Sequence, residues 1–348
     1  MKTINSLLLS AALAVGVTTG AAAAQRKPTA KETKAAAAQR EAGMRSISED
    51  AARAHVYFLA DDLLEGRRAG LRGSRIAKKY IISQIREAGL KPLLGDDYEQ
   101  PFEACAAQKL KRGVRFHVEA DSIAQIKKQV HQTMHLSNVL AVLPGKKADE
   151  MVVVGAHLDH EGMYADVEGD NIYNGADDNA SGVSAVLQIM KAFVVSGAQP
   201  ERTIVFAFWD GEEQGLLGSR YFADHFKDMP KVKCYLNFDM VGSGTDSPYL
   251  MYFFTASHPR LGEWLKADMA TYKFGFNPDY RSWDNPVGGS DQSSFHLKGV
   301  PIVWYHTGGQ PHYNQPSDEA QTVNYPKLTD ITRASYLTTW RMANEADY

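Results

Sequence analysis

Cysteine is nearly absent from this sequence, and neither sign of charge dominates it. The 348 residues include 2 Cys, 38 Lys and Arg, and 41 Asp and Glu, which gives a formal net charge of −3. Two cysteines cannot build a disulfide-rich miniprotein or a zinc site made of thiolates. A near-neutral chain has no basic field with which to bind nucleic acid or anionic lipid. Cys105 and Cys234 could pair or stay reduced, and both states remain open.

No apolar run near the N-terminus is long enough to cross a bilayer. Lys2 precedes an apolar run at residues 7–17, and Ala22-Ala23-Ala24 follows it. This pattern is typical of a cleavable signal peptide. We therefore expect residues 1–24 to be removed and the protein to be exported, periplasmic or secreted, with no membrane anchor afterwards. The Ala- and Lys-rich residues 25–45 predict a leader or a loosely docked helix outside the core.

From residue 46 onward, short apolar runs alternate with amphipathic segments. The periodicity predicts helices over 46–64, 74–88, 181–195 and 216–226. The apolar runs predict strands at 138–143, 151–156, 203–209, 234–240 and 301–306. Nearly continuous apolar strands between helices are typical of a sheet covered on both faces. We expect one α/β domain over residues 46–348, with a central mixed, mostly parallel β-sheet.

Acidic and histidine side chains follow the carboxyl ends of these strands. In open α/β sheets, functional groups gather at that edge. Each residue alone has a simpler explanation, such as a helix cap or a response to the helix dipole. The set comprises His157, Asp159 and His160 after one strand, Asp210, Glu212 and Glu213 after another, Asp239 after a third, Asp177 and Asp178 before a helix, and His312, Tyr313 and Asn314 beyond the last strand.

Carboxylates that converge at one sheet edge repel one another unless a positive charge offsets them. None of these segments contains Lys or Arg, so we expect a bound cation. Imidazole and carboxylate ligands without a thiolate favour Zn²⁺. Asp178, Glu213 and Asp239 against two zinc ions would leave one positive charge, which a hydroxide would neutralise. Glu212, next to Glu213, is placed to take a proton from metal-activated water.

Four motifs give the sequence a specific resemblance to peptidase family M28, a group of two-zinc metallopeptidases. They are GAHLDHEG, GADDNASG, WDGEEQGLLGS and NFDMVG, supported by LADDLLEGRRAG, SDQSSF and PSDE. The resemblance covers roughly residues 46–345. It implies an exopeptidase, most often an aminopeptidase, that cleaves peptides or proteins with a hydroxide that bridges the two metals.

The resemblance also implies a metal-ligand set. His157 and Asp239 would bind one zinc, and Glu213 would bind the other. Asp178 would bridge both ions, and the Asp178–Asn179 peptide bond would be cis.

Further roles concern catalysis. Asp159 would orient the imidazole of His157, and Glu212 would act as general base and then acid. Tyr313 would help polarise the scissile carbonyl.

The last ligand departs from the family pattern. The family usually has Tyr-His at this point, whereas this chain has Tyr313-Asn314. A carboxamide oxygen is a weak zinc ligand. We expect His312 to replace the missing imidazole, with His306, Asn314 or an empty second site as alternatives.

Two rival functions remain open. A single-zinc glutaminyl cyclase of the same fold would usually show Asp-Glu in place of Glu212-Glu213, although Asn314 favours fewer metals. A non-catalytic peptide-binding relative would need neither Glu212 nor Asp159.

The loop over residues 283–295 is expected to shape the substrate pocket. Its aromatic residues Trp283 and Phe295 either accept apolar substrate side chains or pack in the core. The sequence favours neither role.

Overall fold

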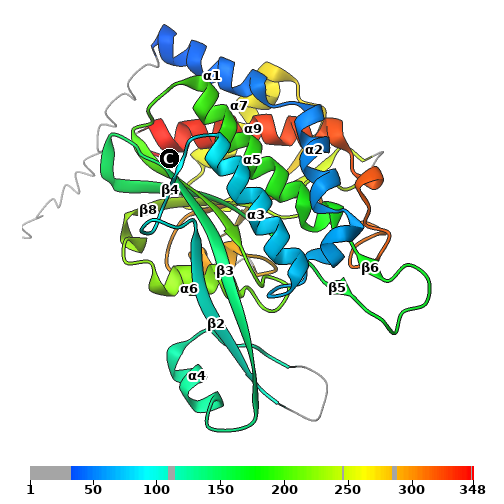
Figure 1. Ribbon diagram of the computed structural model, residues 1–348. Helices are drawn as coiled ribbons and strands as arrows, with labels where there is room; N and C mark the ends of the chain where they lie inside the picture. The colour runs from blue at the N-terminus through cyan, green and yellow to red at the C-terminus, as the bar shows by residue number, and fades with distance from the viewer. Residues whose placement is uncertain (1–32, 109–113, 245–246, 284–287, 346) are drawn as a thin grey trace, which may run out of the picture.

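The computed structural model describes residues 33–108, 114–244, 247–283, 288–345 and 347–348. A twisted mixed sheet forms its centre (Figure 1). The middle strands β7, β4, β8 and β11 run parallel, and β9 and β10 are also parallel to each other, whereas β3 is antiparallel to β7 and β9 is antiparallel to β11. The order is β1 (Lys91–Pro92), β3 (His131–Leu143), β7 (Arg202–Trp209), β4 (Lys147–His157), β8 (Val232–Phe238), β11 (Ile302–His306), β9 (Tyr249–Thr255) and β10 (Asn277–Trp283), with β2 (Glu99–Ala107) paired to β3. The predicted sheet is confirmed.

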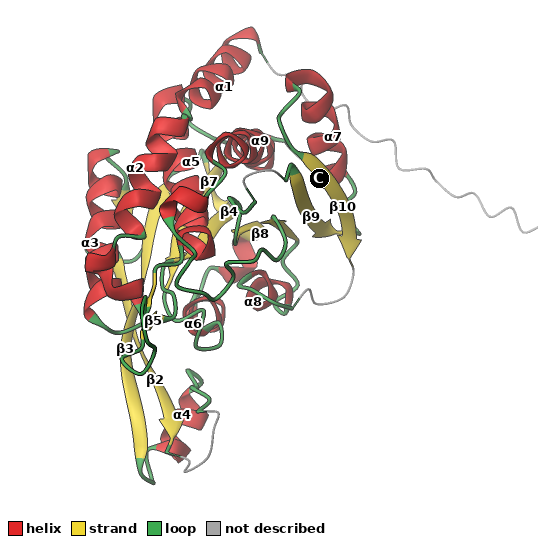
Figure 2. Ribbon diagram, turned by 90° about the vertical axis from the view of Figure 1, so that its right-hand side faces the viewer, coloured by secondary structure: helices red, strands yellow, loops and turns green. Residues whose placement is uncertain are grey.

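Helices cover both faces of this sheet, as predicted (Figure 2). The buried apolar side chains accordingly form one cluster on each face. One face carries α1 (Lys34–Ser46), α2 (Glu49–Leu59), α3 (Arg72–Glu87), α5 (Gly182–Ser196), α7 (Arg260–Tyr272) and α9 (Tyr325–Asn344), and the other carries α6 (Leu217–His225) and α8 (Gln292–His296).

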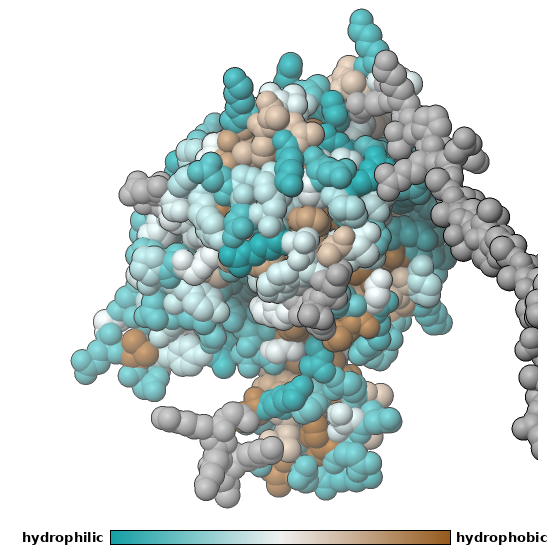
Figure 3. Space-filling model, turned by 180° about the vertical axis from the view of Figure 1, so that it is seen from behind, coloured by the Kyte–Doolittle hydropathy of each residue, from teal (hydrophilic) through white to brown (hydrophobic). Residues whose placement is uncertain are grey.

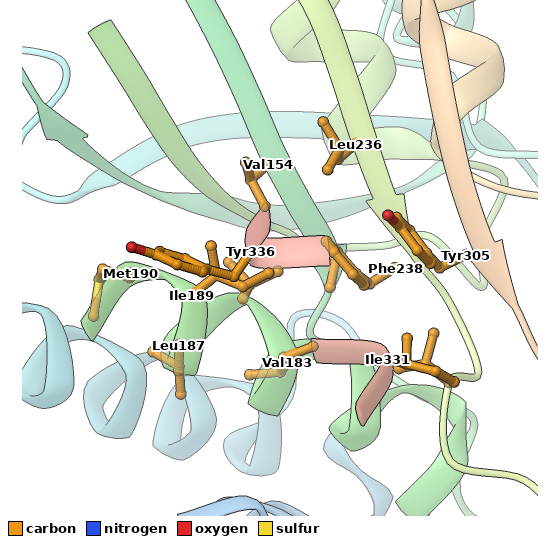
Figure 4. Packing of buried hydrophobic residues seen from close by; sticks show 14 of the residues in the cluster. Val154, Val183, Leu187, Ile189, Met190, Leu236, Phe238, Tyr305, Ile331 and Tyr336 are labelled. Carbon is orange, nitrogen blue, oxygen red and sulfur yellow. The ribbon is translucent and has the colours of Figure 1, made fainter. Parts of the chain in front are cut away.

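Helix α5 lies at the centre of the larger cluster (Figure 4). Its side chains Val183, Leu187 and Met190 follow the predicted helical spacing and are buried. They share the cluster with Val154 of β4 and Leu236 of β8. Each such side chain contributes roughly 1.5–3 kcal/mol by leaving water. This packing fixes α5, and with it the loop just before α5.

The helix predicted over 46–64 is shorter than expected. Ser48 caps α2 by accepting a hydrogen bond from the N–H of Ala51, and the helix ends at Leu59. A 3₁₀ segment, η1 (Asp62–Arg67), follows, and it contains Glu65 and Gly66 at positive φ. A side chain at Gly66 would come within 2.4 Å of the carbonyl oxygen of Tyr173. The chain therefore turns here because the backbone packs too closely for a continued helix.

The described part of the expected leader is a docked helix. Helix α1 packs on α5 and α9, and Met44 is buried. A side chain at Gly43 would meet the hydroxyl of Tyr336 at 2.2 Å, so the packing is close. The predicted signal peptide, residues 1–24, lies outside the described residues. Within the described part of the chain, no helix has the length and apolar character needed to cross a membrane.

A projection extends from one end of the sheet, and the sequence did not predict it. It consists of β2, α4 (Ala120–Ile126) and residues 131–137 of β3, which we call the arm (Figures 1 and 2). A small apolar cluster that includes Phe102, Phe116 and Leu136 holds it together. Seen from behind, its surface mixes hydrophobic and hydrophilic atoms (Figure 3). Cys105 lies in β2 and Cys234 in β8, and both are buried free thiols.

Candidate metal centre

The predicted acids and His157 converge on one pocket. His157 ends β4, Glu212 and Glu213 follow β7, and Asp239 follows β8. Because these strands are parallel neighbours, their carboxyl ends meet at the same edge. Asp178 comes from the loop before α5. Together with Tyr313 they line a cavity of about 300 Å³.

The distances in this pocket suit a metal ion. His157 Nε2 lies 3.2 Å from Asp178 Oδ1 and 3.5 Å from Asp239 Oδ1. Two tetrahedral zinc ligands at about 2.1 Å from the ion are about 3.4 Å apart. Asp178 Oδ1 is buried and has no hydrogen-bond partner among the described residues.

Two overlapping triplets of ligand atoms support the same conclusion. His157, Glu212 and Asp239 offer atoms that all lie within 4.8 Å of one another, and so do His157, Asp178 and Glu213. An imidazole among carboxylates is a ligand set that zinc accepts. The residues therefore fit zinc, which this structure does not contain.

Hydrogen bonds to other segments of the chain hold the loop that carries Asp178. The Asp178–Asn179 peptide bond is cis, as expected. The Asp318 carboxylate accepts hydrogen bonds from the N–H groups of Asp177 and Asp178, both at 3.0 Å. The Asn179 side chain donates to the carbonyl of Phe238 at 2.8 Å. Asp318 of the PSDE motif thus has a structural role that sequence reasoning missed.

Asp159 contacts His157 differently from the expectation. His157 Nδ1 is 3.2 Å from the backbone carbonyl oxygen of Asp159, whereas the nearer carboxylate oxygen is 3.9 Å away. That carboxylate oxygen accepts the backbone N–H of Glu212 at 3.1 Å instead. The main chain of Asp159 therefore orients the imidazole, and its side chain positions the segment that bears the expected base.

His160 is a site residue to which sequence reasoning assigned no role. Its ring is completely buried, and Nδ1 lies 2.7 Å from Glu213 Oε1 and 3.9 Å from Asp178 Oδ2. Burial lowers the pKa of this imidazole. In the sequence, its position directly after Asp159 is the feature that could have indicated a role in the site. His160 holds the carboxylate of Glu213 in one orientation.

Two buried cations, Arg67 and Lys78, reach the acidic segments from the N-terminal part of the chain, although those segments themselves contain no Lys or Arg. Arg67 donates to the carbonyls of Leu59 and Leu158 on one side and of Asn174 and Gly175 on the other. Burial lowers its pKa to about 10, so it remains charged at neutral pH. Arg67 lies outside the segments that contain the acids, so the composition of those segments gives no sign of it.

The second of these cations is Lys78 of α3. Its Nζ lies 2.6 Å from Asp210 Oδ2, and both side chains are buried. The same oxygen accepts the N–H of Ser137 at 3.1 Å. Asp210 is therefore neutralised within the fold and serves as a structural residue.

An excess of buried acid remains around the pocket. Burial raises the pKa of Glu212 well above its usual value and raises that of Glu213 and of Asp159 to about 7. Burial opposes protonation of His157, but the negative charge of Glu212 and the nearby carboxylates of Asp178 and Asp239 raise its pKa. Arg67 alone does not balance these groups, so the pocket still favours a bound cation.

The structure does not bring His312 to this pocket. Its Nδ1 lies 2.9 Å from Ser317 Oγ, and its side chain does not line the cavity. His306 does line the cavity, and its Nδ1 faces the carbonyl oxygen of Asp239 at 2.7 Å. The side-chain oxygen of Asn314 is buried without a hydrogen-bond partner among the described residues.

The aromatic residues of the 283–295 loop divide between core and surface. Phe295 is fully buried and stacks on Tyr235 with ring centroids 3.9 Å apart, so it packs in the core. Trp283 packs edge-on against Phe253 and does not line the cavity. Gly289 of the same loop and Trp304 of β11 do line it.

Comparison with known proteins agrees with this geometry. The model of peptidase family M28 matches residues 138–339. The chain belongs to this family.

Relatives of this M28 chain cover part of its length. Leupeptin-inactivating enzyme 1 of Streptomyces exfoliatus is 31% identical over 186 residues, which span 53% of this chain and 38% of that protein. A probable leucine aminopeptidase of Arthroderma otae is 39% identical over 205 residues, or 56% of this chain and 54% of that protein. This chain thus spans about half, or less, of the length of these relatives.

Solved structures share the fold at low sequence identity. The aminopeptidase of Aneurinibacillus sp. strain AM-1 matches with a TM-score of 0.63 and 17% identity, covering 88% of this chain and 97% of that one. Macrostomum lignano glutaminyl cyclase matches equally well in fold, with a TM-score of 0.63 and 19% identity, covering 87% and 92%.

Proposed function

We propose that this M28 metallopeptidase is an exported zinc aminopeptidase that removes N-terminal residues from peptides. The observation that carries the proposal is His157 Nε2 at 3.2 and 3.5 Å from two buried carboxylates, with Glu212 beside them. Relatives named as leucine aminopeptidases support the exopeptidase activity. The signal-like pattern of residues 1–24 supports export.

His157, Asp178 and Asp239 would hold one zinc ion, and Asp178 with Glu213 would hold a second. Zinc, when bound, would polarise the scissile carbonyl and make water a stronger acid. His160 keeps Glu213 in place, while the carbonyl of Asp159 fixes the ring of His157. These contacts restrict the ligands to one arrangement before any substrate arrives.

Glu212 would move the proton. Its half-buried side chain lines the pocket, and desolvation raises its pKa, so a proton taken from water is held there. Glu212 then returns this proton to the leaving amine. Tyr313, which also lines the pocket, is placed to donate its hydroxyl to the substrate carbonyl oxygen.

A Glu212→Gln variant tests the base. Glutamine keeps the size of the side chain but cannot accept the proton, so zinc content should stay at the wild-type level while turnover of leucine p-nitroanilide falls at least about a thousandfold. Zinc is measured by atomic emission, and turnover is measured with and without a chelator. Wild-type turnover in this variant would contradict the assignment.

The same assays separate the rival functions. One zinc per chain with cyclisation of N-terminal glutamine would favour a glutaminyl cyclase, whose fold this chain shares. No zinc and no turnover would favour a peptide-binding protein.

A further inference from the structure

A groove runs beside the arm, separate from the metal pocket. It encloses about 770 Å³, within the range of ligand-binding clefts. Its walls include residues 68–71 and 132–135, with Arg75, Phe116 and Gln214. Four consecutive residues of β3 line it. Because successive side chains point to opposite faces of a sheet, such a run means that the groove follows the edge of the strand.

This edge of β3 lacks a neighbouring strand. β3 pairs with β7 only from Val139 to Leu143, whereas β2 pairs with β3 on the other side out to His131. Ser137 directs its N–H to the open edge, where Asp210 accepts it. Since backbone groups alternate along a strand, Thr133 and His135 direct theirs the same way. Among the described residues, neither has a backbone partner on that edge.

Residues that are adjacent in the sequence line the groove and the metal pocket. Glu213 lines the metal pocket, and the next residue, Gln214, lines the groove. Likewise, Arg68 lines the groove and forms a parallel bridge with His160, whose ring contacts Glu213. Residues 213 and 214 therefore form part of the boundary between the metal pocket and the groove.

The groove carries positive charge. Its described lining residues include Arg68 and Arg75 and no carboxylate. Arg75 is exposed, with one N–H donated to the carbonyl of Gly70 at 3.2 Å. Arg68 also contributes positive charge. Its Nη1 group donates hydrogen bonds to the backbone carbonyl of Glu161 and to the hydroxyl of Tyr164, both at 2.8 Å. Acidic side chains would be attracted to this lining.

We propose that the groove binds the downstream part of an extended peptide substrate, which pairs as an added strand with the open edge of β3 and places acidic side chains near Arg75. Exposed strand edges recognise peptides in this way, with main-chain bonds for affinity and side-chain pockets for specificity. The proposal rests on the aminopeptidase function and names its preferred substrates, which are peptides with acidic residues downstream of the cleaved bond.

The test compares long and short substrates. Leucine-headed hexapeptides carry either glutamate or lysine at positions four and six, which lie on one side of an extended chain. Leucine p-nitroanilide, too short to enter the groove, serves as the reference. The readout is kcat/KM of each hexapeptide divided by that of the nitroanilide. We expect the glutamate peptide to be preferred about fivefold, mainly through KM, as for a single exposed ion pair.

A charge-reversal variant tests whether Arg75 causes the preference for the glutamate peptide. Arg75→Glu should abolish or invert it, whereas Arg72→Glu should keep it, because Arg72 is exposed on the same helix but does not line the groove. N-methylation of one alternating set of peptide amides should lower the ratio several-fold, and methylation of the other set should not. Equal ratios in wild type and Arg75→Glu, or equal effects of both methylated sets, would overturn the proposal.

Two further results are informative. Sedimentation velocity that shows a dimer at assay concentration, dissociated by Arg75→Glu, would mean that a second copy occupies the edge, and would overturn the proposal. If wild type cleaves neither substrate, the aminopeptidase function fails separately. The groove is then tested by calorimetry with the N-acetylated glutamate hexapeptide, and binding that Arg75→Glu does not weaken would overturn it.

Discussion

At the scale of single residues, the convergence of the expected ligands could be predicted, but the contacts that support them could not. His157, Asp178, Glu213 and Asp239 follow strands or precede a helix in recognisable motifs, and the sheet edge brings them together. Arg67 lies far from them in the sequence and acts on backbone carbonyls, which carry no sequence signature. Contacts of this kind become visible only when the chain is folded.

His160 provides a prediction at this scale. His160→Ala removes the group 2.7 Å from Glu213 Oε1, so zinc affinity at the Glu213 side should fall about 10- to 100-fold. His160→Asn should retain most of the affinity, because its amide N–H can donate from nearly the position of Nδ1. Competition with a chromophoric chelator measures both. Equal affinities in wild type and His160→Ala would show that this contact does not support the metal.

At the scale of elements, apolar patterning predicted the central strands and α5 because most of their side chains are buried. The arm was missed because its strands are partly exposed and its small core joins residues from separate segments. The helix predicted to reach residue 64 was wrong because local spacing does not show that Gly66 packs against another loop. Long-range packing thus decided the boundaries that periodicity could not.

The loop before α5 gives a prediction at this scale. Gly175 has a φ of +60°, and an added Cβ would lie 2.0 Å from the carbonyl oxygen of Asp178 and 2.5 Å from the ring of His160. Gly175→Ala should therefore lower the melting temperature and abolish zinc binding.

Gly197 offers the matched control for that substitution. It has a φ of +63°, but a Cβ there would meet nothing within 4 Å. Gly197→Ala should cost only about 1–2 kcal/mol of backbone strain and leave zinc binding intact. The melting temperature, measured by calorimetry, and the zinc content of both variants test whether the close approach at Gly175 is needed for zinc binding. Similar zinc content in the two would contradict the close approach at Gly175.

At the scale of the whole molecule, the fold concentrates acid at one place while its net charge stays near zero. Burial raises the pKa of Glu213 to about 7, and the surrounding carboxylates raise that of His157. Both groups must lose protons to bind a metal. Zinc affinity should therefore rise as pH increases from about 6 to 8. Calorimetric titration in two buffers of different ionisation enthalpy measures the protons released, and a pH-independent affinity would contradict these pKa directions.

The hydrogen bonds that Arg67 donates to backbone carbonyls, and those that Asp318 accepts from backbone N–H groups, have a consequence for how the site assembles. Arg67 comes from the first quarter of the chain and Asp318 from its last tenth, yet both fix loops that carry proposed metal ligands. We therefore expect a fragment that lacks either segment to leave these loops without their supporting hydrogen bonds. Metal uptake would thus report that both of these segments have docked.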